Sequence, residues 1–131
     1  MILYSFFGLR HSYGPLGIVG TSLGSAIAFA VYAHELRLDA GVFNHISPYF
    51  ADVVWRGIST RQVREGLEEG VGLEELRRLW LPLSPFSYYE HLRDRSRPCL
   101  LIYARYDLSF PPDLSRQLLR DVGKLDIERE V

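Results

Sequence analysis

One serine stands in a setting that can make it a nucleophile. The pentapeptide Gly20-Thr21-Ser22-Leu23-Gly24 has the spacing G-x-S-x-G and follows the apolar run Leu16–Val19. A serine on a sharp strand-to-helix turn takes strained backbone angles, and the residues two positions away must be small to avoid crowding it. The spacing therefore predicts that Ser22 is presented as a nucleophile. The alternative is a Gly/Ser turn without chemistry, because the motif alone is common.

The residue after this serine is expected to take part in the same chemistry. A mostly apolar stretch, Leu23 to Leu36, follows the motif and predicts a helix that begins at Leu23. Backbone N–H groups at a helix N-terminus carry partial positive charge and lack intrahelical acceptors. We therefore expect the N–H of Leu23 to face an oxyanion that forms beside Ser22.

A second chemical candidate follows a later strand. The run Leu100-Leu101-Ile102-Tyr103-Ala104-Arg105-Tyr106-Asp107 is strongly apolar before its charged end. Together with the serine motif it resembles the α/β-hydrolase superfamily, and the resemblance covers nearly the whole chain. It implies that Ser22 is the nucleophile, Leu23 N–H half of the oxyanion hole and Asp107 the catalytic acid. Asp107 as a plain turn residue or helix cap, and Asp52 as the acid, remain alternatives.

The histidines depart from this resemblance. The family order is serine, acid, histidine, and no histidine follows Asp107. The chain thus resembles the C-terminal half of the fold, truncated before the catalytic histidine and without the front strands. We expect it to hydrolyse activated esters poorly or not at all by itself. His45, at the end of its predicted strand, is expected to line a pocket; its role as a base stays open.

A narrower resemblance points to a bacterial branch of the same superfamily. It is carried by Val54-Trp55-Arg56-Gly57-Ile58-Ser59-Thr60 and by Tyr106-Asp107. Several aromatic residues lie in the same region, among them Tyr49 and Trp55. They form either a hydrophobic layer over the sheet or the wall of a pocket for an acyl or aromatic group.

Apolar runs alternate with helix-like stretches, which predicts an α/β fold. We expect a parallel sheet of roughly four strands with helices on both faces, that is, a partial α/β-hydrolase fold. Residues 1–131 would form a single domain with a helical excursion at 52–90. The predicted strands are Leu16–Val19, Ala40–Ile46, Cys99–Ala104 and Leu125–Val131, and a helix opens at Pro111-Pro112-Asp113.

Composition excludes several classes of function. Fifteen basic residues against sixteen acidic ones give a net charge of −1, which provides no footprint for nucleic acid or an anionic membrane. The lone Cys99 and the spacing of the four histidines offer no metal site. No apolar stretch approaches the roughly 20 residues that span a bilayer. We expect a cytoplasmic protein without a cofactor.

Two functional hypotheses follow from these observations. The first is a serine hydrolase-like protein that acts on a small-molecule ester or related acyl bond through an acyl-serine intermediate. The second is a non-catalytic or degenerate hydrolase module that binds a small molecule or a protein partner. In the family's strand order, the Leu16–Val19 strand would lack a neighbour here, so we also expect self-association through an exposed sheet edge.

Overall fold

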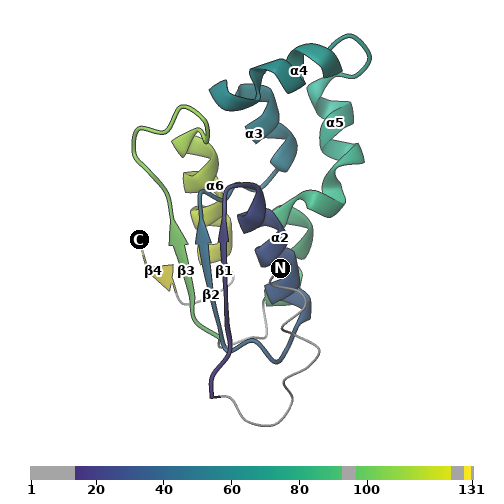
Figure 1. Ribbon diagram of the computed structural model, residues 1–131. Coiled ribbons are helices and arrows are strands. Elements are labelled where there is room, and N and C mark those ends of the chain that lie inside the picture. Colours follow the sequence, from purple (N-terminus) through teal and green to yellow (C-terminus); the bar gives the residue numbers. More distant parts are fainter. Residues whose placement is uncertain (1–13, 93–96, 125–128, 131) are drawn as a thin grey trace.

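The computed structural model describes residues 14–92, 97–124 and 129–130, and its centre is a parallel sheet (Figure 1). The strands are β1 (Gly17–Thr21), β2 (Ala40–Asn44), β3 (Cys99–Ile102) and β4 (Arg129–Glu130). They lie in the order β1-β2-β3-β4, and every neighbouring pair is parallel. The predicted α/β class and parallel sheet are confirmed.

Helices make the connections between these strands, as parallel neighbours require. Helix α2 (Leu23–His34) joins β1 to β2, and α6 (Pro112–Gly123) follows β3. Several short helices lie between β2 and β3 in the chain, in the region of the predicted excursion; the first of them lie beyond the carboxyl ends of the strands, and the last packs against α2 (Figure 1). They are α3 (Phe50–Arg56), η1 (Ile58–Thr60), α4 (Arg61–Leu67), α5 (Leu73–Leu79), η2 (Leu81–Leu83) and η3 (Pro85–Leu92).

The main hydrophobic core lies between one face of the sheet and the helices α2 and α6. Phe43 of β2 meets Phe29 and Tyr32 of α2 edge-on, with ring centroids 5.1 and 5.5 Å apart. Leu101 of β3 and Leu118 of α6 are buried in the same cluster. Parallel strands added in sequential order by right-handed crossovers place their helices on one face. The hydrophobic core therefore lies on one face of the sheet.

The opposite face of the sheet is open in the described part of the chain. Val19, Val42 and Leu100 lie in register across three strands, and Val19 is 63% exposed. Ile102, on the same face, is 41% exposed. The second helical layer that we expected over this face is not found among residues 14–92, 97–124 and 129–130. Apolar side chains are left in contact with solvent as a result.

Several expectations fall partly outside the described residues. The apolar segment Met1–Leu9 lies outside them, and so does most of the predicted strand Leu125–Val131. The two described residues of that strand, Arg129 and Glu130, pair with β3. Within the described ranges, no helix is both long enough and apolar enough to cross a membrane.

Candidate active site

Ser22 occupies a strained turn between β1 and α2. Its φ of 55° and ψ of −123° lie in a region that side-chain-bearing residues rarely adopt, and the residue is exposed. A Cβ atom at Gly20 would come within 2.4 Å of the Gly24 carbonyl oxygen, so the position requires glycine. A Cβ at Gly24 would meet nothing within 4 Å. The predicted steric requirement therefore holds before the serine and is wrong after it.

Leu23 begins α2 directly after Ser22. Its N–H is one of the first-turn groups that have no acceptor within the helix. The carbonyl oxygen of Ser22 accepts the N–H of Ser25 at 2.9 Å, which closes the first turn around the serine. The backbone thus places Leu23 N–H beside the exposed serine, where the sequence predicts an oxyanion donor.

His45 has the same position and backbone conformation after β2 as Ser22 has after β1. The residues before them, Thr21 and Asn44, are register partners, and the φ of His45 is also 55°. The hydroxyl oxygen of buried Ser25 lies 2.6 Å from the Ser22 carbonyl oxygen and 3.0 Å from that of His45. Its single hydrogen can be donated to either of them. Ser25 therefore fastens the two strained residues to one point of α2.

Asp107 lies at the same end of the sheet, in the loop that follows the carboxyl end of β3. Its Oδ1 accepts the N–H groups of Ser109 and Phe110 at 2.8 and 2.9 Å. Its Oδ2 lies 2.8 Å from Nδ1 of His45, although the approach is too oblique for a hydrogen bond. Among the described histidines, His45 is therefore the one whose imidazole lies against Asp107.

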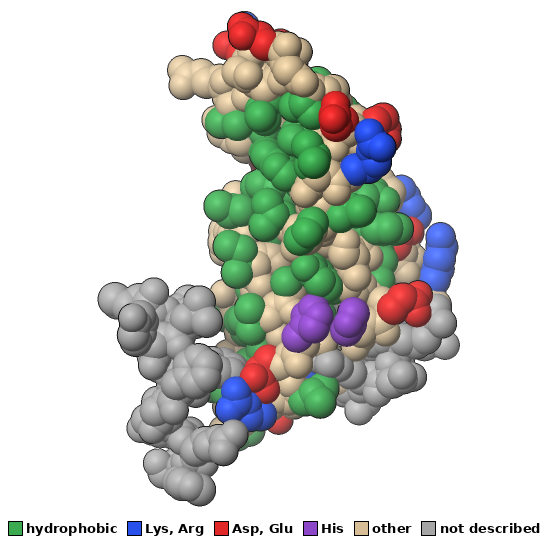
Figure 2. All heavy atoms as spheres, turned by 90° about the vertical axis from the view of Figure 1, so that its right-hand side faces the viewer, with side chains coloured by type: hydrophobic (Ala, Val, Ile, Leu, Met, Phe, Trp, Pro, Cys, Tyr) green, Lys and Arg blue, Asp and Glu red, His purple; other side chains and the backbone are tan. Residues whose placement is uncertain are grey.

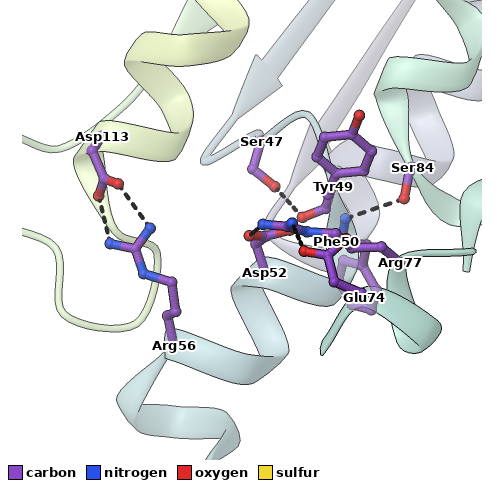
Figure 3. Close-up of polar contacts among 9 residues, drawn as sticks. All are labelled: Ser47, Tyr49, Phe50, Asp52, Arg56, Glu74, Arg77, Ser84 and Asp113. Carbon is purple, nitrogen blue, oxygen red and sulfur yellow. Dashed lines mark hydrogen bonds and ion pairs between the residues drawn. The ribbon is translucent and has the colours of Figure 1, made fainter. Parts of the chain in front are cut away.

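The loop of Asp107 rests on the turn that follows α3. Ile58 donates its N–H to the Leu108 carbonyl oxygen at 3.0 Å. A Cβ at Gly57 would lie 2.4 Å from the carbonyl oxygen of Ser109, so only glycine lets the loop approach. Arg56 binds Asp113 with two hydrogen bonds of 2.7 and 3.0 Å (Figure 3). The Val54–Thr60 motif thus has a physical role that the sequence did not reveal, because its contacts are more than 40 positions away.

Asp52, the alternative acid, is occupied elsewhere. Its side chain is 4% exposed and forms two hydrogen bonds with Arg77 of α5, at 2.8 and 2.5 Å (Figure 3). The hydrogen-bonded carboxylate raises the pKa of Arg77. Glu74 pairs with the same guanidinium. Asp52 therefore fastens α3 to α5 and makes no described contact with Ser22 or His45.

The two aromatic candidates for a pocket wall lie on or next to α3. Tyr49 stacks on Phe86 at 4.9 Å and lies under the guanidinium of Arg77 at 5.5 Å. Burial raises the pKa of the Tyr49 hydroxyl. Trp55 is partly buried on α3. Neither residue makes a described contact with Ser22, and their place in a pocket wall stays a prediction.

Two of the apolar grooves among the described residues lie at this part of the molecule, and one of them reaches Leu23, the residue after Ser22. One, of about 250 Å³, lies along the end of β3. The other, of about 190 Å³, lies between α2 and η2 and is lined by Leu23, Ile27, Pro82, Leu83 and their neighbours. No group of three or more metal-binding side chains occurs within the described residues.

The other histidines are separate from the site. His34 and His91 are exposed and lie against each other, with ring centroids 4.5 Å apart. His34 Nδ1 lies 2.7 Å from the Ala30 carbonyl oxygen. His11 lies outside the described residues. His45 is the one described histidine placed with Asp107.

Comparison with known proteins shows the fold of which this arrangement is part. No family model and no curated protein matches the sequence. An acylaminoacyl peptidase of Pyrococcus horikoshii superposes on 97% of this chain with a TM-score of 0.72 and 19% identity. A second structure of that enzyme, uncomplexed, covers 88% of the chain with a TM-score of 0.66 and 20% identity. An acylaminoacyl peptidase bound to Z-Gly-Gly-Phe-chloromethyl ketone covers 97%, with a TM-score of 0.73 and 20% identity.

The likeness concerns only part of those proteins. The chain spans 18 to 20% of the length of each peptidase chain. The chain therefore has an α/β fold that corresponds to part of the fold of these peptidases.

Proposed function

We propose that this protein is a serine hydrolase-like protein that acts on an ester or related acyl bond. One observation carries the proposal: the exposed Ser22 has a φ of 55° at a strand-to-helix turn, and Asp107 lies at the same end of the sheet. Strained backbone angles persist where the surrounding structure enforces them, and they concentrate at functional sites. The fold of the solved peptidases supports the same reading.

The proposed reaction proceeds through an acyl-serine intermediate. The Ser22 hydroxyl oxygen attacks the carbonyl carbon, and the Leu23 N–H stabilises the oxyanion. The carbon–oxygen bond to the leaving group then breaks and leaves the acyl group on Ser22. Water attacks the same carbonyl carbon, the bond to the Ser22 oxygen breaks, and the acid is released. Asp107 orients an imidazole that carries the proton between these steps.

The substrate class follows the chemistry of the site and the names of the neighbours. Ser22 and an N-terminal helix N–H suit any acyl carbonyl, so esters are the simplest substrates to test. The neighbours are acylaminoacyl peptidases, one of them bound to a blocked peptide. Short N-blocked peptide esters that end in an aromatic residue are therefore included in the proposed class.

A fluorophosphonate probe tests this proposal directly. Ser22 would displace fluoride from phosphorus and gain a stable phosphonyl group, which intact mass and peptide mapping locate. We expect Ser22→Ala to abolish labelling and Ser59→Ala, which removes another exposed serine, to leave it unchanged. A folded wild-type protein that stays unlabelled at Ser22 would overturn the proposal.

A second candidate function, a non-catalytic module, is favoured by the apolar surface beside α2. Leu23 and Ile27 are 49% and 51% exposed, and Leu83 beyond them is 43% exposed. Figure 2 shows this side of the molecule, with hydrophobic side chains gathered over much of it. Patches of this kind mark interaction sites.

For this candidate we propose a second copy of the chain as the partner. In the described sheet β1 is an end strand, and Val19 on it is 63% exposed. Such edges pair with strands of other chains. Light scattering after size exclusion should show a mass that rises with concentration, and Val19→Lys should lower it. A wild-type mass that stays monomeric at every concentration would exclude this partner.

A further inference from the structure

The geometry at the carboxyl ends of β1, β2 and β3 points to His45 as the general base for Ser22, so that Ser22, His45 and Asp107 form one catalytic unit. The inference rests on the proposed hydrolase function. Its first support is position. Ser22 and His45 directly follow Thr21 and Asn44, which are register partners on adjacent parallel strands. The two residues therefore leave the sheet at the same carboxyl end, from strands that neighbour each other at about 4.8 Å, and the Ser22 N–H donates to the Asn44 carbonyl oxygen at 3.0 Å.

The second support is the strain that the two residues share. Ser22 and His45 are the described non-glycine residues with positive φ, and both values are 55°. Such a conformation is unfavourable for a residue with a Cβ atom and persists only where the surrounding structure enforces it. Ser25 lies within hydrogen-bond distance of both carbonyl oxygens, and its side chain is fully buried. One polar group in the core thus holds both strained positions at a fixed separation.

The third support is the way in which Asp107 meets the imidazole. Two backbone N–H groups occupy Oδ1 and leave Oδ2 for Nδ1 of His45, 2.8 Å away. A carboxylate beside Nδ1 favours the tautomer with the proton on Nδ1, which leaves the lone pair of Nε2 to accept a proton. The oblique approach is compatible with this role, because catalytic hydrogen bonds often align only when substrate binds.

The surroundings leave this imidazole both held and reachable. The His45 side chain is 26% exposed and that of Asp107 16% exposed. The ring of Phe110 lies 6.2 Å from that of His45. The N–H of His45 donates to the Ile102 carbonyl oxygen at 2.9 Å, which fixes its backbone between β2 and β3.

The proton balance of the reaction closes with these three residues. As the Ser22 oxygen–carbon bond forms, Nε2 of His45 takes the hydroxyl proton. It returns that proton to the leaving alkoxide when the ester bond breaks. In the second half Nε2 takes a proton from water and returns it to Ser22. Asp107 stays ionised throughout and balances the imidazolium charge.

The test replaces His45 by glycine and supplies imidazole from solution. Glycine adopts a φ of 55° without strain, so His45→Gly removes the ring and relieves the backbone. We expect fluorophosphonate labelling of Ser22 to slow by about 10²- to 10⁴-fold. Added imidazole should restore part of the rate in this variant and leave the wild type unchanged. His34→Gln and His91→Gln, at exposed histidines, are the matched controls and should label at the wild-type rate.

Each outcome bears on one level of the inference. Labelling of His45→Gly at the wild-type rate would overturn the role of His45 while Ser22 remains a nucleophile. Slow labelling without rescue by imidazole would also overturn it, since the ring would then act only by positioning. A wild-type protein unlabelled at Ser22 would remove the proposed function itself. Should His45→Gly fail to melt cooperatively, His45→Asn replaces it, because asparagine also tolerates positive φ.

A second readout does not depend on phosphonylation. Z-Gly-Gly-Phe-chloromethyl ketone is the compound bound to one of the solved peptidases. When its ketone carbonyl is bound at a serine, its chloromethyl group can alkylate an imidazole nitrogen that lies next to that serine. Chloride leaves as Nε2 forms a bond to the methylene carbon. We expect peptide mapping to find the adduct on His45 and to lose it in Ser22→Ala. Equal labelling of exposed His34 and His91 would indicate unspecific alkylation and overturn the assignment.

Discussion

Two aspartates of this chain, Asp52 and Asp107, follow neighbouring strands and yet contact different kinds of partner. Asp52 is 4% exposed and holds the guanidinium of Arg77 with two hydrogen bonds. Asp107 is 16% exposed and shares its oxygens between two backbone N–H groups and the imidazole of His45. A guanidinium stays charged at any working pH, whereas an imidazole gains and loses a proton.

The difference teaches which partner gives a carboxylate a chemical role. Asp52 with Arg77 forms a permanent ion pair that joins α3 to α5, and nothing in it can move a proton. Asp107 with His45 can stabilise a charge that comes and goes during a reaction. The position after a strand is therefore not sufficient to propose a catalytic acid, and the partner of the carboxylate, guanidinium for Asp52 and imidazole for Asp107, must be considered as well.

The largest effect is expected for Asp107→Asn. The backbone N–H groups of Ser109 and Phe110 require an oxygen, so the new amide would turn its NH₂ towards Nδ1 of His45. Imidazole would then carry its proton on Nε2 and could not accept one from Ser22. We expect the rate of ester hydrolysis or probe labelling to fall by about 10³- to 10⁴-fold, with a melting temperature close to that of the wild type.

The matched control for this variant is Asp113→Asn, which changes another aspartate near the same loop. Asp113 is 58% exposed and contacts Arg56 rather than His45. It should keep its hydrolytic rate. An Asp107→Asn variant as active as the wild type would mean that the contact with His45 has no catalytic consequence.

Asp52→Asn should produce the reverse pattern, a large loss of stability with little change in rate per folded molecule. The change leaves the Arg77 guanidinium, which is 31% exposed, with only the exposed Glu74 carboxylate as its ionic partner, and losing the buried hydrogen-bonded carboxylate costs about 1 to 3 kcal/mol. Denaturant unfolding measures the loss. Glu75→Gln, at an exposed position on α5, is the control and should leave the free energy of unfolding unchanged. An equal fall in rate at full folding would place Asp52 in the reaction after all.

An intermediate effect is expected for Gly57→Ala, which acts on the support of Asp107. The new methyl group would lie 2.4 Å from the Ser109 carbonyl oxygen and 2.6 Å from that of Val53. The Asp107 loop must shift, so we expect a loss of about 1 to 3 kcal/mol in stability together with a lower rate. Gly66→Ala on α4 meets nothing within 4 Å and should be neutral or stabilising. A rate unchanged in Gly57→Ala would mean that the loop position does not matter.

The sequence predicted the elements better than it predicted the contacts between them. The apolar runs and the G-x-S-x-G spacing depend on local sterics, and β1, α2, β2, β3 and α6 all occur near their expected positions. The pairing of Asp52 with Arg77 joins residues 25 positions apart. Such contacts depend on how helices pack, which no local pattern encodes. The contact of His45 with Asp107 could have been anticipated from two neighbouring strand ends, but not the strained φ that aims the histidine.

Arg97 gives a further example of a role that the sequence could not show. Arg97 directly follows residues 93–96, which lie outside the described residues. Arg97 itself donates to the carbonyl oxygens of Tyr32, Glu35 and Leu38 and lies 4.0 Å above the Tyr32 ring. It thus binds three carbonyl oxygens at and just after the C-terminal end of α2. Only the folded backbone brings these oxygens together.

The smallest effect is expected for Arg56→Met. The variant removes the ion pair of Arg56 with Asp113, which is more exposed than the pair of Arg77 with Asp52. Arg56 and Asp113 are 42% and 58% exposed, and exposed pairs contribute about 0.2 to 1 kcal/mol. The hydrogen-bonded Arg56 lowers the pKa of Asp113, so the pair stabilises the fold above the ordinary pKa of an aspartate. That stabilisation is lost as the pH falls through the lowered pKa. Unfolding titrations should therefore separate wild type and variant at pH 7 and bring them together in strong acid. A gap as large as that of Asp52→Asn would show that exposure does not distinguish the two pairs.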